Sequence, residues 1–167
     1  MMLDSGLRKQ EVLHLQVYNV DVINELIRIK DSKGSKDRNV PLGRITKKLY
    51  LKYINNRPLT SHSNVFINID REPMSEWSMK MVLQRLQEKL EIRQFNAHYF
   101  RHTFATKFLI NQITLTGVSD IEQLREILGH ESTRVTRQYL HLANQYLIKT
   151  QRYGILTNVQ MNINRKK

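Results

Sequence analysis

The sequence contains no cysteine, only three prolines and one tryptophan, and no long uninterrupted hydrophobic run. Without cysteine the protein has no disulfide framework, no cysteine nucleophile and no thiolate metal site. No segment approaches the roughly 18 consecutive apolar residues of a membrane-spanning helix, and no charged-then-apolar leader opens the chain. From these absences we expect an intracellular protein with no membrane partner.

Histidine is the remaining residue type with a high affinity for metals, and its pattern does not favour a metal site. The six histidines are His14, His62, His98, His102, His130 and His141. Only His98 and His102 share a helical face at a suitable spacing, and no glutamate completes the zinc-protease pattern there. We therefore expect neither a metal nor another cofactor.

Acidic residues are also few, since 15 Asp and Glu stand against 27 Lys and Arg, a net charge of +12. Such an excess is typical of proteins that bind polyanions, because Lys and Arg displace the counterions condensed on phosphates. Nine Lys or Arg and only two acids lie between residues 28 and 52. This concentration predicts a phosphate-tracking surface, although a solvated basic loop is the alternative. The DNA-binding candidates are Lys30, Lys36, Arg38 and Arg44.

The length of 167 residues suits a single domain with its own core. A composition of 40% hydrophobic and 25% charged residues is ordinary for a globular protein. No internal repeat, low-complexity tract or linker divides the chain. We expect one domain over residues 1–167, with a polar and basic tail over 154–167 that is either mobile or exchanged with a neighbour.

Hydrophobic periodicity predicts an α+β fold, mainly α-helical, with a small three-stranded antiparallel sheet near the N-terminus. The strands are expected over 17–20, 26–29 and 39–42. The helices are expected over about 8–15, 45–55, 75–90, 98–110, 119–128 and 132–147, with caps at Ser75, Ser119 and Ser132. A further short strand is expected over 65–67, and a loop over 111–118.

Two stretches of the sequence carry polar side chains at spacings that suit binding of, and attack on, a phosphate. His98 and Arg101 are three residues apart on one helix face, so that both can grip a single phosphate. Alone this pair is a weak signal, because a buried histidine bonded to a carbonyl is the commoner explanation of such a pattern. In "LGHESTRVTRQYLH" Gly129 suits the left-handed position at which a helix ends. His130 is therefore expected in the turn between two helices, with Tyr139 on the second of them.

Five motifs, "SGLRKQE", "KGSKDRNVPL", "HYFRHTFAT", "LGHES" and "VTRQYLH", stand in the order and approximate spacing of the phage integrase, or tyrosine recombinase, family. From about residue 5 to residue 142 the chain resembles the catalytic domain of that family. The resemblance implies a site-specific DNA recombinase that cleaves and rejoins strands through a 3′-phosphotyrosyl intermediate, without metal or ATP. A type IB topoisomerase, whose catalytic set is similar, and an inactive DNA-binding remnant are the alternatives.

The resemblance implies a catalytic set of Arg8, Lys33, His98, Arg101, His130 and Tyr139. The two arginines are expected to neutralise charge on the scissile phosphate while Tyr139 attacks it. A phenol with an ordinary pKa near 10 needs cations and a proton acceptor close by. His98 is the preferred acceptor of the phenol proton, and His130 is the preferred hydrogen-bond donor to the phosphate. The two histidines can also exchange these roles.

Three lysines compete for the remaining role, protonation of the departing 5′ oxygen. Lys33 is preferred because it directly precedes a glycine in the family's hairpin pattern, and Lys30 and Lys36 are its rivals. Two more residues are expected to support the set. Glu11 is expected to orient Arg8, although a surface ion pair is equally consistent, and His102 is expected to contact the phosphate or the backbone.

The resemblance also implies partners. They are double-stranded DNA and further copies of the protein, which in full-length family members form a tetramer on DNA. Only seven residues precede Arg8, whereas the family's catalytic domain begins with additional helices and follows a separate core-binding domain. We therefore expect an N-terminally truncated chain that is a monomer or dimer and binds DNA weakly by itself.

Overall fold

A three-stranded antiparallel sheet in the order β1-β2-β3 forms part of one half of the molecule. The computed structural model describes residues 1–30, 37–92 and 96–150. Within them the strands are β1 (Val20–Asp21), β2 (Leu26–Ile29) and β3 (Arg38–Pro41). Ile27 of β2 pairs with Val40 of β3, and both are fully buried. Alternation along these strands therefore turns one face of the sheet toward a core.

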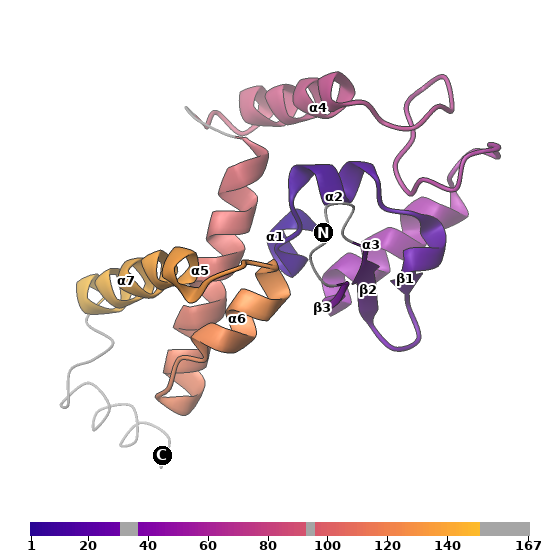
Figure 1. Ribbon diagram of the computed structural model, residues 1–167. Coiled ribbons are helices and arrows are strands. Elements are labelled where there is room, and N and C mark those ends of the chain that lie inside the picture. The colour runs from indigo at the N-terminus through magenta and orange to yellow at the C-terminus, as the bar shows by residue number, and fades with distance from the viewer. Residues whose placement is uncertain (31–36, 93–95, 151–167) are drawn as a thin grey trace, which may run out of the picture.

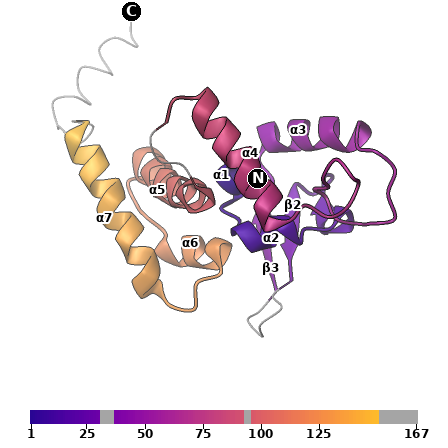
Figure 2. The same cartoon turned by 90° about the horizontal axis from the view of Figure 1, so that it is seen from above.

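Helices make up most of the rest of the described chain. They are α1 (Met2–Ser5), α2 (Lys9–Leu13), the 3₁₀ helix η1 (Val17–Asn19), α3 (Arg44–Asn55), α4 (Glu76–Lys89), α5 (Ala97–Thr116), α6 (Ile121–Leu128) and α7 (Thr133–Lys149). Figures 1 and 2 show α5, α6 and α7 together on one side, the sheet with α2 and α3 on the other, and α4 reaching across the top. None of the described helices is long and apolar enough to span a membrane.

Two hydrophobic clusters correspond to these two sides. The first consists of Leu7, Val12, Leu13, Leu15, Val20, Ile27, Ile29, Val40, Leu42, Tyr50, Val65 and Met79. The second consists of Phe104, Ala105, Leu109, Ile110, Ile113, Leu124, Leu128, Tyr139, Ala143 and Leu147. Ile127 of α6 packs against both. The seam between the clusters is thus formed by α2, β3, α5 and α6, and charged side chains occupy it.

Gly6 turns the chain at this seam. Its φ of +66° lies in the left-handed region, and a Cβ atom there would stand 2.4 Å from Cδ1 of Phe104. Only glycine permits both the turn and this close approach to α5. The turn leaves the Gly6 carbonyl facing Arg101, with which it forms a hydrogen bond described below.

The predicted fold class is confirmed, and the differences lie at the edges of the elements. The strand predicted over 17–20 is wrong except at Val20, because Val17–Asn19 form η1. There the Gln16 amide donates to the Asn19 side chain at 3.4 Å. The expected strand over 65–67 is also wrong. The chain there makes only isolated bridges, Gln16 with Asn64 and Ile67 with Pro73, and proline cannot donate to a ladder.

The loop predicted over 111–118 is wrong for most of its length, since α5 continues to Thr116 and ends at the left-handed Gly117. Burial of Ile113 in the second cluster stabilises these additional turns. The cap of α6 is Asp120 rather than Ser119, and its side chain accepts from the Gln123 amide at 2.8 Å. Ser75 caps α4 as expected, and Ser132 occupies the cap position of α7 without a capping hydrogen bond. The tail predicted over 154–167 lies outside the described residues.

Candidate active site

Arg101 of α5 lies at the centre of the seam and is only 3% exposed. Its Nη1 donates to the Gly6 carbonyl at 2.7 Å, and its Nη2 donates to the Leu128 carbonyl at 2.6 Å. Burial, followed by the repulsion of Arg8, lowers its pKa to about 10, so the side chain remains charged at neutral pH. A guanidinium has five N–H donors, and these two bonds leave three for a ligand.

Arg8 stands at the start of α2 on the opposite side of the seam. Its Nη2 donates to the Gly129 carbonyl at 2.6 Å, and its Nη1 donates to Oε1 of Glu11 at 2.9 Å. The Arg8 amide also donates to Oε2 of Glu11 at 2.7 Å, so both carboxylate oxygens of Glu11 accept from Arg8. The structure therefore brings together Arg8 and Glu11, the pair that the sequence expects.

The DNA-binding candidates occupy different environments. Lys30 and Arg44 are exposed, whereas Lys36 lies outside the described residues, as does the catalytic candidate Lys33. Arg38 does not lie on the outer surface expected of a phosphate contact, because only 10% of its side chain is exposed. Its Nη2 donates to Oε1 of Glu11 at 2.8 Å and its Nε to the Ile127 carbonyl at 2.9 Å. These bonds place it among the catalytic candidates.

His130 follows Gly129, whose φ of +62° ends α6 in the left-handed conformation that the sequence predicts. The His130 Nδ1 shares a hydrogen bond with the hydroxyl of Thr136 at 2.9 Å. Burial, together with Arg101, Arg8 and other nearby cations, lowers the pKa of His130 to about 4, so the ring is neutral at pH 7. Thr136 is fully buried and was missed by the sequence analysis. Its only signal is its position three residues before Tyr139, on the same helix face.

His98 and His102 lie on one face of α5, as the sequence expects. His98 is exposed at the start of the helix, where its amide donates to the side chain of the cap residue Asn96 at 2.9 Å. The two imidazole rings meet edge to face at 4.2 Å, and the ring of His102 lies 5.3 Å from that of Tyr139. Burial and the neighbouring His98 lower the pKa of His102. The ring of His102 thus packs against the rings of both His98 and Tyr139.

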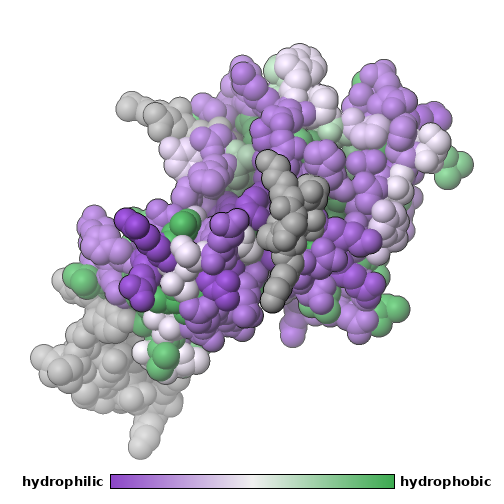
Figure 3. Space-filling view, viewed as in Figure 1, coloured by the Kyte–Doolittle hydropathy of each residue, from purple (hydrophilic) through white to green (hydrophobic). Residues whose placement is uncertain are grey.

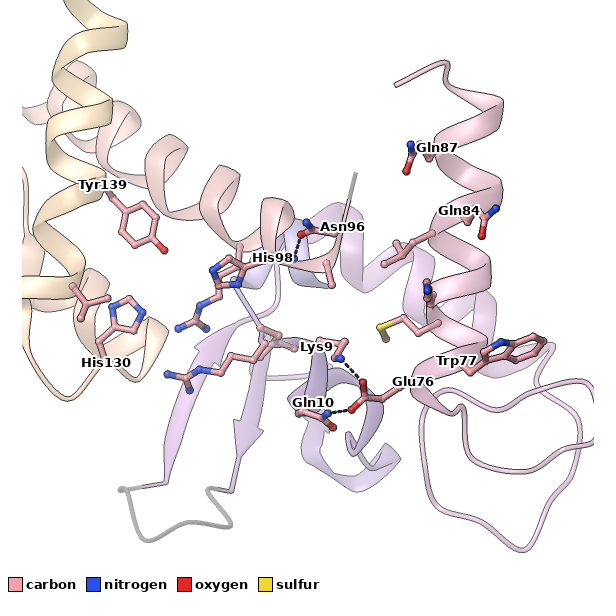
Figure 4. A pocket seen from close by; sticks show the side chains of 18 of the residues that line it. Lys9, Gln10, Glu76, Trp77, Gln84, Gln87, Asn96, His98, His130 and Tyr139 are labelled. Atoms are coloured by element: carbon pink, nitrogen blue, oxygen red, sulfur yellow. Dashed lines mark hydrogen bonds and ion pairs between the residues drawn. The ribbon is translucent and has the colours of Figure 1, made fainter. Parts of the chain in front are cut away.

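Tyr139 of α7 is only 2% exposed and belongs to the second hydrophobic cluster. Its ring stacks beside that of His130, with centroids 6.3 Å apart. In Figure 4 its hydroxyl points toward the space bordered by His98 and His130. Burial raises the pKa of the phenol, and the charge of Arg101 opposes that rise. Ionisation of Tyr139 therefore depends on the cations and proton acceptors of this site.

An open cleft of about 1070 Å³ lies between α2, α4, α5 and α7, and one end of it is lined by Arg8, His98, Arg101, His130 and Tyr139. Glu76 at the start of α4 contacts both Lys9 and Gln10 of α2, so these residues join two of the helices that border the cleft (Figure 4). The molecular face shown in Figure 3 is largely hydrophilic, with scattered hydrophobic residues. No cluster of His, Cys, Asp or Glu suited to a metal ion occurs in the part of the chain that the structure describes.

The geometry suits nucleophilic attack on a phosphodiester. Two guanidiniums from different elements border the place where a phosphate would lie, and a phenol enters it from α7. Guanidinium donors pair with the non-bridging oxygens of a phosphate, whose charge grows as a nucleophile adds to phosphorus. Neutral imidazoles beside the phenol are able to accept its proton.

Comparison with known proteins identifies the fold and the family. The fold is that of tyrosine recombinases: the crystal structure of XerA recombinase superimposes with a TM-score of 0.79 at 28% identity, over 92% of this chain and 56% of that chain. Residues 1–146 match the phage integrase family, and the chain belongs to that family.

Two further relatives are similar over most of this chain. It is 29% identical to the tyrosine recombinase XerC of Staphylococcus haemolyticus over 149 residues, 87% of this chain and 48% of the relative. The crystal structure of XerH site-specific recombinase bound to its difH substrate, in a pre-cleavage complex, gives a TM-score of 0.69 at 26% identity. That similarity covers 84% of this chain and 40% of the XerH chain. The chain thus spans about half the length of the curated relatives it matches.

The neutral state of His130 predicts that acid destabilises the fold. Its pKa is lowered from 6.5 to about 4 in the folded protein, so the unfolded chain binds a proton first as the pH falls. The contribution of His130 to stability is complete above pH 6.5 and is lost progressively toward pH 4. We expect a loss on the order of 1–2 kcal/mol between about pH 7 and about pH 5.

Urea unfolding at those two pH values measures this loss, and His130→Gln is the matched variant because glutamine has no titrating group. The variant is expected to lose less stability than the wild type over the same interval. Equal losses in the two proteins would show that His130 is not the acid-sensitive group.

Proposed function

We propose that this chain is the catalytic domain of a site-specific DNA recombinase or integrase, which cleaves and rejoins strands through a 3′-phosphotyrosyl intermediate. The observation that carries the proposal is the convergence of Arg8, Arg101, His130 and Tyr139, from four separate segments of the chain, on one end of one cleft. The relative XerC is named a tyrosine recombinase, and the XerH structure contains its DNA substrate. Both support double-stranded DNA as the partner.

In the proposed reaction the Tyr139 oxygen forms a bond to phosphorus and the bond from phosphorus to the 5′ oxygen breaks. The phenolic proton passes to an imidazole, for which His98 remains the preferred acceptor. Arg8 and Arg101 neutralise the non-bridging oxygens as their charge grows. A second proton, proposed to come from Lys33, converts the departing oxygen to a 5′-hydroxyl. One phosphodiester replaces another, so that a second 5′-hydroxyl reverses the reaction without ATP.

The role of His130 depends on its bond to Thr136. When the Thr136 hydroxyl donates to Nδ1, the other ring nitrogen carries the proton and donates to the phosphate. When Nδ1 donates to Thr136 instead, the other nitrogen becomes an acceptor. We propose the first arrangement, because the low pKa of the ring keeps it neutral and a phosphate in the cleft needs a donor.

The proposed partners are double-stranded DNA and, in the active assembly, further copies of the protein in a tetramer. Lys30 and Arg44 are exposed and available for phosphate contacts outside the cleft. The activity is proposed to take place on DNA in the cytoplasm of a bacterium, where the gene belongs to a phage or another mobile element.

Trapping of a covalent intermediate tests the proposal. The protein is incubated with a pool of nicked duplexes of randomised sequence, in which the cleaved fragment diffuses away and rejoining stops. We expect an adduct that survives denaturing electrophoresis, with the nucleotide attached to the peptide that contains Tyr139 by mass spectrometry. Attachment to another tyrosine would overturn the assignment, and DNA binding without any adduct would favour an inactive DNA-binding protein. Efficient relaxation of supercoiled plasmids of arbitrary sequence would favour a topoisomerase.

A further inference from the structure

The carboxylate of Glu11 is shared by two guanidiniums. Its Oε1 accepts from Nη1 of Arg8 at 2.9 Å and from Nη2 of Arg38 at 2.8 Å, and only 13% of the Glu11 side chain is exposed. Arg8 comes from the start of α2, whereas Arg38 comes from β3. A single acid therefore fixes the distance between an arginine of the catalytic set and an arginine of the sheet.

Arg38 also contacts the segment that carries His130. Its Nε donates to the Ile127 carbonyl at 2.9 Å. A Cβ atom on Gly129 would stand 2.9 Å from Nη1 of Arg38. The guanidinium therefore packs directly against the end of α6. The same segment accepts from Arg8 through the Gly129 carbonyl. Arg38 therefore contacts both Glu11, which orients Arg8, and the turn that orients His130.

We propose that Arg38 is a positioning residue of this active site, which aligns Arg8 with His130 by bridging Glu11 and the end of α6. The consequence for catalysis rests on the proposed function, whereas the bridge itself does not. Arginine is required because its planar fork donates in two directions at once, whereas the single ammonium of lysine cannot span both acceptors. Arg38 does not line the cleft that Arg8 and Arg101 line, and its Nη2 and Nε are bonded to Glu11 and Ile127, so we assign it no direct phosphate contact.

Electrostatics give the bridge a second effect. Burial alone would raise the pKa of Glu11, but Arg38 and the amide of Arg8 hold that pKa below its ordinary value. Glu11 consequently remains charged and offsets the repulsion among Arg8, Arg38 and Arg101. Without Arg38, Glu11 loses a partner and Arg8 loses the rigid carboxylate that holds it toward the cleft.

The bridge is tested first by a measurement that needs no DNA. Carboxyl NMR titration of Glu11 is carried out in the wild type, Arg38→Gln, Arg38→Lys and Arg57→Gln. Arg57 is the matched control, because it also donates to backbone carbonyls, those of His62, Asn64 and Val65, but contacts no residue of the site. We expect the Glu11 pKa to rise in Arg38→Gln, to remain low in Arg38→Lys and to be unchanged in Arg57→Gln. An unchanged value in Arg38→Gln would overturn the bridge.

The second measurement separates positioning from DNA contact. At saturating protein, both Arg38 variants are expected to form the covalent adduct up to about a hundredfold more slowly, the effect that a misplacement of about 1 Å can produce. The salt dependence of DNA binding is expected to stay the same, whereas loss of a phosphate contact would reduce its slope by about 1. A reduced slope with an unchanged rate, or full activity in Arg38→Lys, would contradict the proposal.

The two measurements also separate this inference from the proposed function. If the wild type forms no adduct, the proposed function fails, but the Glu11 titration still decides whether Arg38 holds the bridge. If the wild type forms the adduct and the Glu11 pKa does not respond to Arg38, only the positioning role fails.

Discussion

Tyr139→Phe is expected to abolish the covalent adduct while leaving the fold as stable as the wild type to within about 1 kcal/mol. Tyr139 is only 2% exposed, and its ring packs beside those of His102 and His130. Phenylalanine retains this packing and removes only the hydroxyl. Since the missing oxygen is the proposed nucleophile, no bond to phosphorus can form. Denaturing electrophoresis of the trapped adduct and urea unfolding measure the two effects.

Tyr146 provides the matched control on the same helix. It is 38% exposed and lies beneath the ammonium of Lys107, whose Nζ is 5.0 Å from its ring centroid. Tyr146→Phe is expected to leave adduct formation unchanged, because this phenol does not line the cleft. Adduct formation by Tyr139→Phe at the wild-type rate, or its loss in Tyr146→Phe, would identify the wrong tyrosine.

The local patterns on α5, α6 and α7 were sufficient to predict much of this site. His98 and Arg101 line the cleft together because a spacing of three residues places them on one helix face. Gly129 adopts the left-handed conformation expected after the buried stripe of α6, so His130 occupies the joint. These features depend on a few neighbouring residues, which is why periodicity and turn chemistry indicate them before the fold is known.

The environment of Arg38 shows where composition misleads. Its many basic neighbours indicate a solvent-facing DNA contact, yet Arg38 and the buried Val40 are two apart on β3 and therefore share a face of the sheet. The alternation of the strand thus predicts that Arg38 shares the face of the buried Val40. It does not predict that α6 packs against this face, because that contact does not follow from local sequence. Such contacts join residues far apart in the chain, as between Arg38 and Ile127, so sequence periodicity cannot assign them.

The length of α5 and the bond between His130 and Thr136 escaped prediction for the same reason. Ile113 extends the helix because the second cluster buries it, although its immediate neighbours, Gln112 and Thr114, are polar. Thr136 lies inside because α7 packs on α5 and α6, which brings its hydroxyl to the His130 ring. The candidate residues that line the cleft were thus predictable, whereas the contacts that hold them depend on how the two hydrophobic clusters meet.

Arg101→Ala is expected to lower both stability and activity because Arg101 joins those clusters. The change leaves the carbonyls of Gly6 and Leu128 without their buried donors, at a cost of about 2–5 kcal/mol. It also removes a cation from the phosphate site, for which a loss of about 10²–10³ in rate is typical. Arg101→Lys is expected to retain the charge but to reach only one carbonyl, so its stability falls less.

Arg57→Ala separates the two effects of Arg101, because Arg57 also donates to backbone carbonyls but lies outside the cleft. We expect Arg57→Ala to lower stability without slowing adduct formation, when rates are measured at a temperature where urea unfolding shows each variant to be folded. Equal slowing in both arginine variants would mean that instability alone limits the reaction. Slowing confined to Arg101→Ala means that the guanidinium acts on the phosphate as well as on the fold, since only that variant empties a position facing Tyr139.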